Sequence, residues 1–254
     1  MTIAADTRLA GHPFVARLSR LMKLSAADLA GLSQIVEDER LVKKRHDLIV
    51  HGDEYRNLCF VKNGYAIRYR LLRNGKRQIL NVILPGDVIG FPVSFFDRSI
   101  CAVVAVSDLA YDSCCLESYV RLCYERPQFG LVLTWLVARE AATYAEHLVG
   151  LGRRTPIERT AHFLLEVHAR LLEVGRADGA SFDLPFSQEI IADVLGLSVP
   201  HLNRMMQQLR ADQLITCRAR LVELTDIVGL QKLAQYQPLD LAPIPTVADV
   251  RLSG

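Results

Sequence analysis

The sequence predicts an α+β protein with an N-terminal antiparallel β-roll (a cupin-like jelly roll), a long dimerisation helix and a C-terminal winged helix-turn-helix. Three observations lead to this prediction. Turns containing glycine recur at even spacing between short β-type runs, one long segment carries apolar residues three and four apart, and two short helical segments meet at a glycine. The expected units are 14–118 for the β-roll, 119–152 for the long helix, 153–235 for the winged unit and 236–254 for a loosely ordered tail.

The length of 254 residues and the hydrophobic content of 50% indicate one large folded domain or two smaller ones. Lys and Arg number 30 and Asp and Glu 28, which excludes binding to polyanions by bulk charge but not by a local basic surface. No run approaches the roughly 18 apolar residues of a membrane-spanning helix. The first residues also lack the apolar core of a signal peptide, so we expect a cytoplasmic protein without membrane contact.

The six cysteines form no Cys-x-x-Cys pair, so we expect free thiols and no metal site. No motif places a nucleophile, a base and an orienting group together, and the sequence therefore does not indicate an enzyme.

The N-terminal half begins with helical spacing of apolar residues over 14–32, where Ser25 is a plausible helix cap. From 40 to 116, short runs of Val, Ile, Tyr and Leu alternate with polar residues, which predicts short β-strands. Asn63-Gly64 and Asn74-Gly75 are hairpin signals, because both residue types accept positive φ. The turns between the runs contain Gly52, Gly64, Gly75, Gly86 and Gly90.

The segment from Gln128 to Val149 contains no proline and only one early glycine, which predicts a long helix. Its apolar seam predicts pairing of two such helices in a homodimer; the alternative is one face of a core helix in a monomer. We expect the helix to break at 150–154 and a new one to start at Thr155-Pro156-Ile157-Glu158, which has the pattern of a capping box. The seam residues are Leu131, Trp135, Ala138, Ala142, Ala145 and Val149.

The segment 187–208 reads as two short helices joined by a tight turn. Ser187 caps the first, Gly196 follows Ala192 by four residues and permits the turn, and Ser198 caps the second. This pattern predicts a helix-turn-helix whose second helix enters the DNA major groove; an ordinary helical hairpin is the alternative. The residues expected to face DNA are Ser187, Gln188, Ser198, Val199, Pro200, His201, Asn203, Arg204, Gln207 and Gln208.

The segment 213–224 predicts two short strands around a turn, which would form a wing. Arg218 and Arg220 are placed to contact backbone phosphates. Arg153 and Arg154 could do the same, and an interdomain hinge explains them equally well.

The whole order of elements, from about Phe14 to Gln235, resembles the Crp/Fnr family of bacterial transcription regulators. The resemblance implies a homodimer in which a β-roll senses an effector and paired long helices relay the signal to two DNA-binding heads. It also implies contact with RNA polymerase. The most specific residues are His51-Gly52-Asp53-Glu54, Val61-Lys62-Asn63-Gly64, Leu84-Pro85-Gly86-Asp87-Val88-Ile89-Gly90 and the unit 187–208.

The resemblance places an effector pocket in the β-roll but leaves its ligand open. Cyclic-nucleotide binders of the family carry Glu after the second glycine, where this chain has Phe91, and Ala after Arg-Ser, where it has Ile100. The ribose would lose its acceptor, so cyclic AMP is not expected. Nor is an iron–sulfur cluster, because the first cysteine is Cys59. The pocket residues implied are Gly86, Asp87, Gly90, Phe91, Arg98 and Ser99.

Two alternatives for the control of activity remain: a ligand-dependent sensor of a cyclic nucleotide or another small anion, and redox control through cysteines such as Cys114-Cys115. On the recognition helix, Arg204 matches the family's base-reading arginine. Pro200 replaces the usual Glu and, unlike Glu, cannot accept a hydrogen bond from cytosine, so the usual half-site is not expected. Finally, the segment 40–77 holds eleven basic and three acidic residues. This surplus predicts a solvated strand face or a contact with an anionic effector, polymerase or bent DNA.

Overall fold

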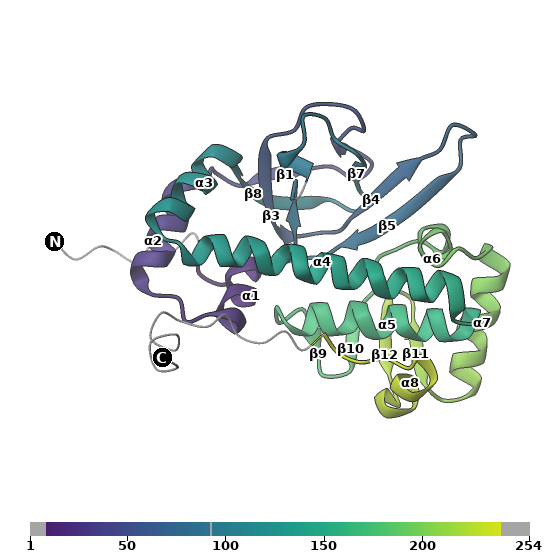
Figure 1. Cartoon of the computed structure of the whole chain (residues 1–254). Coiled ribbons are helices and arrows are strands. Elements are labelled where there is room, and N and C mark those ends of the chain that lie inside the picture. Colours follow the sequence, from purple (N-terminus) through teal and green to yellow (C-terminus); the bar gives the residue numbers. More distant parts are fainter. Residues whose placement is uncertain (1–8, 92, 240–254) are drawn as a thin grey trace, which may run out of the picture.

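The structure is a computed structural model that describes residues 9–91 and 93–239. Figure 1 shows a β-roll with the short helices α1, α2 and α3 at one end, the long helix α4 running beneath it, and a C-terminal unit below α4. Within the described ranges, no helix is both long and apolar enough to cross a membrane.

The helical stretch predicted at the N-terminus forms two helices, α1 (Pro13–Leu21) and α2 (Ala26–Ile35). The predicted cap is confirmed. The Ser25 hydroxyl accepts from the Asp28 backbone N–H at 3.2 Å, and the Asp28 carboxylate accepts from the Ser25 N–H at 2.9 Å. This reciprocal capping box fixes where α2 begins.

The β-roll consists of two four-stranded antiparallel sheets, in the orders β1-β8-β3-β6 and β2-β7-β4-β5. Buried side chains such as Val61, Ala66 and Val103 come from both sheets and fill the space between them. The strands are β1 (Arg40–Val42), β2 (Asp47–Ile49), β3 (Asn57–Asn63), β4 (Ala66–Leu71), β5 (Arg77–Ile83), β6 (Val88–Ile89), β7 (Ala102–Ala105) and β8 (Leu109–Cys115).

The two Asn-Gly signals have different outcomes. Asn74-Gly75 joins β4 to β5, which pair with each other, so this hairpin prediction is confirmed. Asn63-Gly64 joins β3 to β4, which belong to different sheets, so the hairpin prediction is wrong there. Gly64 has a φ of +84°, and a Cβ at this position would collide with the backbone of Asp108. The glycine therefore serves a corner between sheets.

Helix α3 (Leu116–Glu125) leads into α4 (Gln128–Arg153), which ends within the expected segment 150–154 but continues through Gly150 and Gly152. Each helical glycine costs only about 1 kcal/mol relative to alanine, so two of them do not end a long helix. The helix ends where Arg154 and Thr155 turn extended before Pro156. Helix α5 (Pro156–Leu172) then begins with the predicted capping box.

The C-terminal unit contains the predicted helix pair and wing. Its sheet has the order β11-β12-β10-β9, and β11 and β12 are the two strands of the wing. The elements are β9 (Ala177–Asp178), β10 (Ser181–Asp183), α6 (Gln188–Leu195), α7 (Val199–Ala211), β11 (Ile215–Arg218), β12 (Leu221–Leu224) and α8 (Ile227–Ala234). Most of the tail expected at 236–254 lies outside the described residues.

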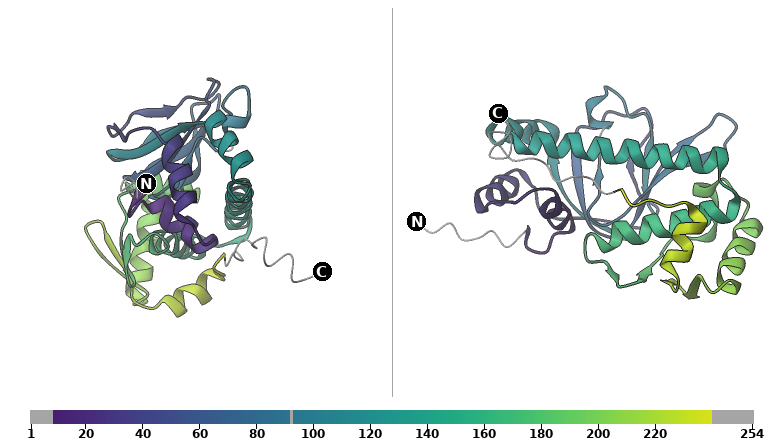
Figure 2. Two further views of the ribbon diagram at one scale, coloured as in Figure 1. Left: turned by 90° about the vertical axis from the view of Figure 1, so that its left-hand side faces the viewer. Right: turned by 60° about the horizontal axis from the view of Figure 1, so that its bottom comes forward.

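The C-terminal unit packs against the β-roll of the same chain. One hydrophobic cluster contains Ile79 and Val82 from the sheet together with Leu164 and Leu171 from α5. Helix α6 contacts β5, and the right-hand view of Figure 2 shows the green C-terminal helices and the β4–β5 hairpin at the same end of the molecule. The two halves therefore share a core.

Candidate nucleic-acid interface and sensor cavities

The turn between α6 and α7 has the geometry that the sequence predicts. The Ser187 hydroxyl accepts from the Ile190 N–H at 3.4 Å at the start of α6. Gly196 ends α6 with a φ of +62°, and its N–H donates to the Ala192 carbonyl. Ser198 occupies the N-cap of α7, but its side chain makes no capping hydrogen bond. Its hydroxyl is therefore available to another partner.

Helix α7 has one buried and one exposed face. Leu202 and Leu209 are buried against the rest of the unit. The exposed predicted residues are Pro200, Arg204, Gln207 and Gln208, and His201 and Asn203 are half-buried. The Asn203 amide donates to the Gln188 side chain at 3.1 Å, which ties the two helices together on their polar side.

One predicted DNA-facing residue departs from the pattern. Val199 is half-buried and packs against the hydrophobic cluster that α5 shares with the β-roll. Val199 lies three positions before Leu202 and seven before Met206, so helical periodicity places it on the inward, apolar face of α7.

The wing arginines have unequal surroundings. Arg218 is exposed and has no ion-pair partner among the described residues, whereas Arg220 binds the Asp183 carboxylate at 2.8 Å. At the end of α4, Arg153 is exposed, but Arg154 binds Glu146 at 2.6 Å. The hinge interpretation therefore fits Arg154 better than phosphate contact does.

The six residues assigned to the effector pocket are not gathered around one cavity. Arg98 is exposed and donates to the Gly52 carbonyl at 3.0 Å. The buried Ser99 hydroxyl donates to the Cys101 carbonyl at 2.5 Å, and Phe91 packs edge-on against Phe95. Gly90 makes its predicted turn with a φ of +98°. Gly86 and Asp87 belong to a buried ionic network described below.

A cavity of about 460 Å³ lies elsewhere, between β4, β5, α4 and α6. Leu80, Ile100, Leu148 and Val194 give it a mainly apolar wall, and Arg70 and Gln78 add polar groups. Its size falls within the range of small-molecule sites, roughly 300–1,000 Å³. Since Val194 belongs to the first helix of the helix-turn-helix, an occupant would touch the DNA-binding unit directly.

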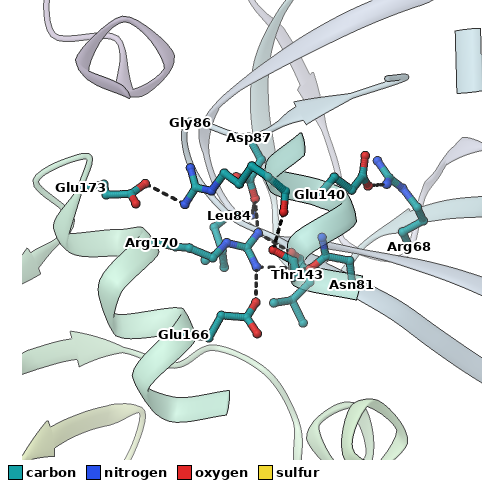
Figure 3. A network of polar contacts seen from close by, with 12 residues as sticks. Arg68, Asn81, Leu84, Gly86, Asp87, Glu140, Thr143, Glu166, Arg170 and Glu173 are labelled. Carbon is teal, nitrogen blue, oxygen red and sulfur yellow. Dashed lines mark hydrogen bonds and ion pairs between the residues drawn. The ribbon is translucent and has the colours of Figure 1, made fainter. Parts of the chain in front are cut away.

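The ionic network joins the β-roll to α1, α4 and α5 (Figure 3). Arg170 of α5 donates to Asp87 at 2.5 Å, to Glu166 at 2.9 Å and to the Val82 carbonyl at 2.8 Å. Arg17 of α1 donates to the same Asp87 at 2.5 Å. Burial alone would raise the pKa of Asp87, but the charges of Arg170 and Arg17 outweigh it and hold that pKa below its usual range.

His147 of α4 extends the network. Its Nε2 lies 2.8 Å from a Glu166 oxygen. Burial opposes the charge on both groups. The attraction between them nevertheless raises the pKa of His147 and, together with Arg170, lowers that of Glu166 to about 2. Sequence reasoning missed this network, because its members look like ordinary surface charges along the chain.

The basic surplus of the segment 40–77 is partly balanced in space. Six of the eleven basic residues form ion pairs with acids from outside the segment, so the folded surface is less positive than the sequence suggests. These pairs are Arg40–Glu37, Lys43–Asp108, Arg56–Asp97, Lys62–Glu39, Arg68–Glu140 and Arg77–Asp193.

Comparison with known proteins agrees with this architecture. A model of the cyclic nucleotide-binding domain matches residues 39–111, and a model of the Crp-like helix-turn-helix domain matches residues 158–233. The nitrogen fixation regulation protein FixK of Bradyrhizobium diazoefficiens is 33% identical over 177 residues, which span 68% of this chain and 72% of FixK. The chain belongs to the Crp/Fnr family.

Two further relatives support the assignment. The transcriptional activatory protein AadR of Rhodopseudomonas palustris is 31% identical over 84% of this chain and 88% of its own length. The structure of FixK2 from Bradyrhizobium japonicum matches with a TM-score of 0.72 and 28% identity, covering 79% of this chain and 98% of FixK2. This Crp/Fnr protein is thus a DNA-binding transcription regulator.

Proposed function

We propose that this regulator acts as a homodimer that reads a pseudo-palindromic DNA site through α7, with its activity controlled through the β-roll. The exposed side of α7 is the observation that carries the proposal. Arg204, Gln207 and Gln208 are exposed on it, and Arg204 has no ion-pair partner among the described residues. Arginine can bridge two guanine acceptors, and glutamine can pair with adenine, so this face can discriminate bases.

Phosphate contacts would hold the helix in register. The Ser198 hydroxyl makes no capping bond and sits at the N-terminus of a 13-residue helix, where N–H groups favour an anion. Arg218 supplies a free guanidinium from the wing. These groups position the protein and carry no base information.

Dimerisation is proposed from the exposed side of α4. Of the predicted seam, Leu131, Ala138, Ala145 and Val149 are exposed. The other two are not exposed: Trp135 is half-buried against the hydrophobic cluster to which α1, α2, β3 and α3 contribute, and Ala142 is half-buried.

The exposed stripe also includes Thr134, Ala141 and Leu148, each one position before a predicted seam residue. Pairing of α4 with the α4 of a second copy would bury this stripe. The contact face would then be rotated around the helix axis relative to the predicted seam. The two-fold axis would set two α7 helices roughly 34 Å apart.

Selection from random DNA by the full chain tests the proposal. Recovery of an inverted repeat with half-site centres about one helical turn apart supports a dimeric reader. Recovery of a single half-site, or of no preferred sequence, would contradict it.

Control by a small molecule in the 460 Å³ cavity is the form of regulation that the structure favours, since this cavity touches sensor and DNA-binding elements together. Redox control has weaker support. Burial raises the pKa of Cys59 to about 11 and that of Cys114 further, which disfavours the reactive thiolate. Contact with RNA polymerase, in the cytoplasm, completes the proposed role as a transcription regulator.

A further inference from the structure

A second, smaller cavity of about 60 Å³ lies inside the ionic network, where α1, the β-roll, α4 and α5 meet. Four arginines line it, one from each of α1, β4, α4 and α5. Only two carboxylates line it with them, Asp87 and Glu140. The arginines are Arg17, Arg68, Arg139 and Arg170.

Three of these guanidinium groups have buried N–H donors that find no hydrogen-bond acceptor among the described residues. They are Nη2 of Arg17, Nη1 of Arg139 and Nε of Arg68. The Arg17 side chain is only 3% exposed, so bulk water does not reach it. A buried charged donor without an acceptor is costly, and native proteins rarely leave several of them in one place.

Four carboxylates offset the charges of the four arginines. Asp87 and Glu140 line the cavity, whereas Glu166 and Glu173 contact the arginines from outside its wall. Burial first, and then the positive charges of Arg17 and Arg170, lower the pKa of Arg139 to about 10. The feature that remains unsatisfied is therefore the set of unpartnered N–H donors.

We propose that this cavity binds one small inorganic anion, which accepts hydrogen bonds from the unpartnered N–H groups of Arg17 and Arg139. A single water needs only about 10–15 Å³ of such space, so the cavity has room for chloride, nitrate or phosphate. Water would accept the same hydrogen bonds, but an anion accepts them with charge on both partners, which makes them stronger, and it has no hydrogens of its own that need acceptors.

The site would hold the molecule together at the junction of its parts. Arg17 belongs to α1, Arg139 to α4 and Arg170 to the first helix of the DNA-binding unit. An anion bound among them stabilises the arrangement in which α5 rests on the β-roll, by linkage between binding and conformation. This inference does not rest on the proposed mode of DNA reading.

Thermal unfolding of the full chain provides the test. The concentration of chloride, nitrate or phosphate is raised while sodium gluconate is lowered, so that the ionic strength stays constant. Gluconate is too large for the cavity and serves as the anion that does not bind. We expect a saturable rise in Tm with at least one of the three. In Arg139→Gln the half-saturating concentration should rise at least tenfold, whereas Arg20→Gln, an exposed arginine on α1, should behave as the unmodified protein.

A second variant fills the cavity without removing charge. Thr143 is buried in its wall, and Thr143→Leu should abolish the anion-dependent rise in Tm while all four arginines remain. Crystals soaked in sodium bromide should show an anomalous peak between Arg17 and Arg139. The proposal is overturned if that position holds only water, or if the anion response is the same in both variants as in the unmodified protein.

Discussion

Arg170 and Asp87 lie 83 positions apart in the chain, yet their side chains meet at 2.5 Å with exposures of only 8% and 16%. One belongs to the first helix of the DNA-binding unit and the other to the turn before β6. The pair therefore ties the orientation of the DNA-binding unit to the β-roll by a bond that water scarcely screens.

Removal of one partner of this pair should be strongly destabilising. Asp87→Ala leaves Arg170 and Arg17 buried without their shared carboxylate, so we expect a loss of about 3–5 kcal/mol in the free energy of unfolding, measured by urea titration. Asp183→Ala breaks the exposed pair with Arg220 and should cost no more than about 1 kcal/mol. Equal losses in the two variants would contradict the role given to the network.

His147 should make stability depend on pH near neutrality. Its pKa is raised in the folded state, so its ion pair with Glu166 contributes fully below the unfolded value of 6.5 and is lost as pH rises through the raised value. The stability difference between the unmodified protein and His147→Gln should thus be larger at pH 6 than at pH 9. Urea titrations at both values measure it, and a difference that grows with pH would refute the assignment.

Glu166 acts at the acid end of the same pair. Its pKa falls from 4.5 to about 2 on folding, so its contribution is present above pH 4.5 and lost as pH falls toward 2. The two effects are separable because their pH windows do not overlap.

Arg204→Ala should weaken binding to a selected site by about 1–3 kcal/mol, equivalent to roughly 5- to 150-fold, and relax the preference at the contacted base. Binding to unrelated DNA should change little. Arg121→Ala, at an exposed position on α3, serves as the control. Fluorescence anisotropy on specific and scrambled duplexes measures both affinities, and an equal loss on both would reduce Arg204 to a phosphate contact.

Ala141→Glu should convert a dimer into a monomer, because it places a charge on the exposed stripe of α4. Ala211→Glu introduces the same side chain at an exposed alanine on α7 and should leave the dimer intact. Sedimentation velocity distinguishes the two species. If the unmodified protein sediments as a monomer at micromolar concentration, the proposed homodimer is contradicted.

The features that could be predicted from the sequence are those specified by neighbouring residues. Ser25, Thr155 and Ser187 cap helices through residues three positions away, so local chemistry is sufficient. The same locality explains the error at Asn63-Gly64. An Asn-Gly pair specifies positive φ, but it does not specify whether the next strand joins the same sheet.

The ionic network could not be predicted, because its partners are distant in sequence. Arg17 contacts Asp87 across 70 positions, and nothing near either residue marks it as buried. The surroundings of Arg98 could not be predicted for a related reason. The Arg-Ser pattern persists, but its side chain points to Gly52 in a neighbouring loop. The helix-turn-helix, with all its spacings inside one short segment, was recognised correctly.

The continuity of α4 through Gly150 and Gly152 limits how a signal can travel. Its 26 residues form a rod about 39 Å long, and only Arg154 and Thr155 separate it from the next helix. A movement that travels along α4 therefore arrives as a tilt or a roll of the whole rod and meets a joint of two residues before α5. The contacts of α5 and α6 with the β-roll form a second connection, which bypasses that joint.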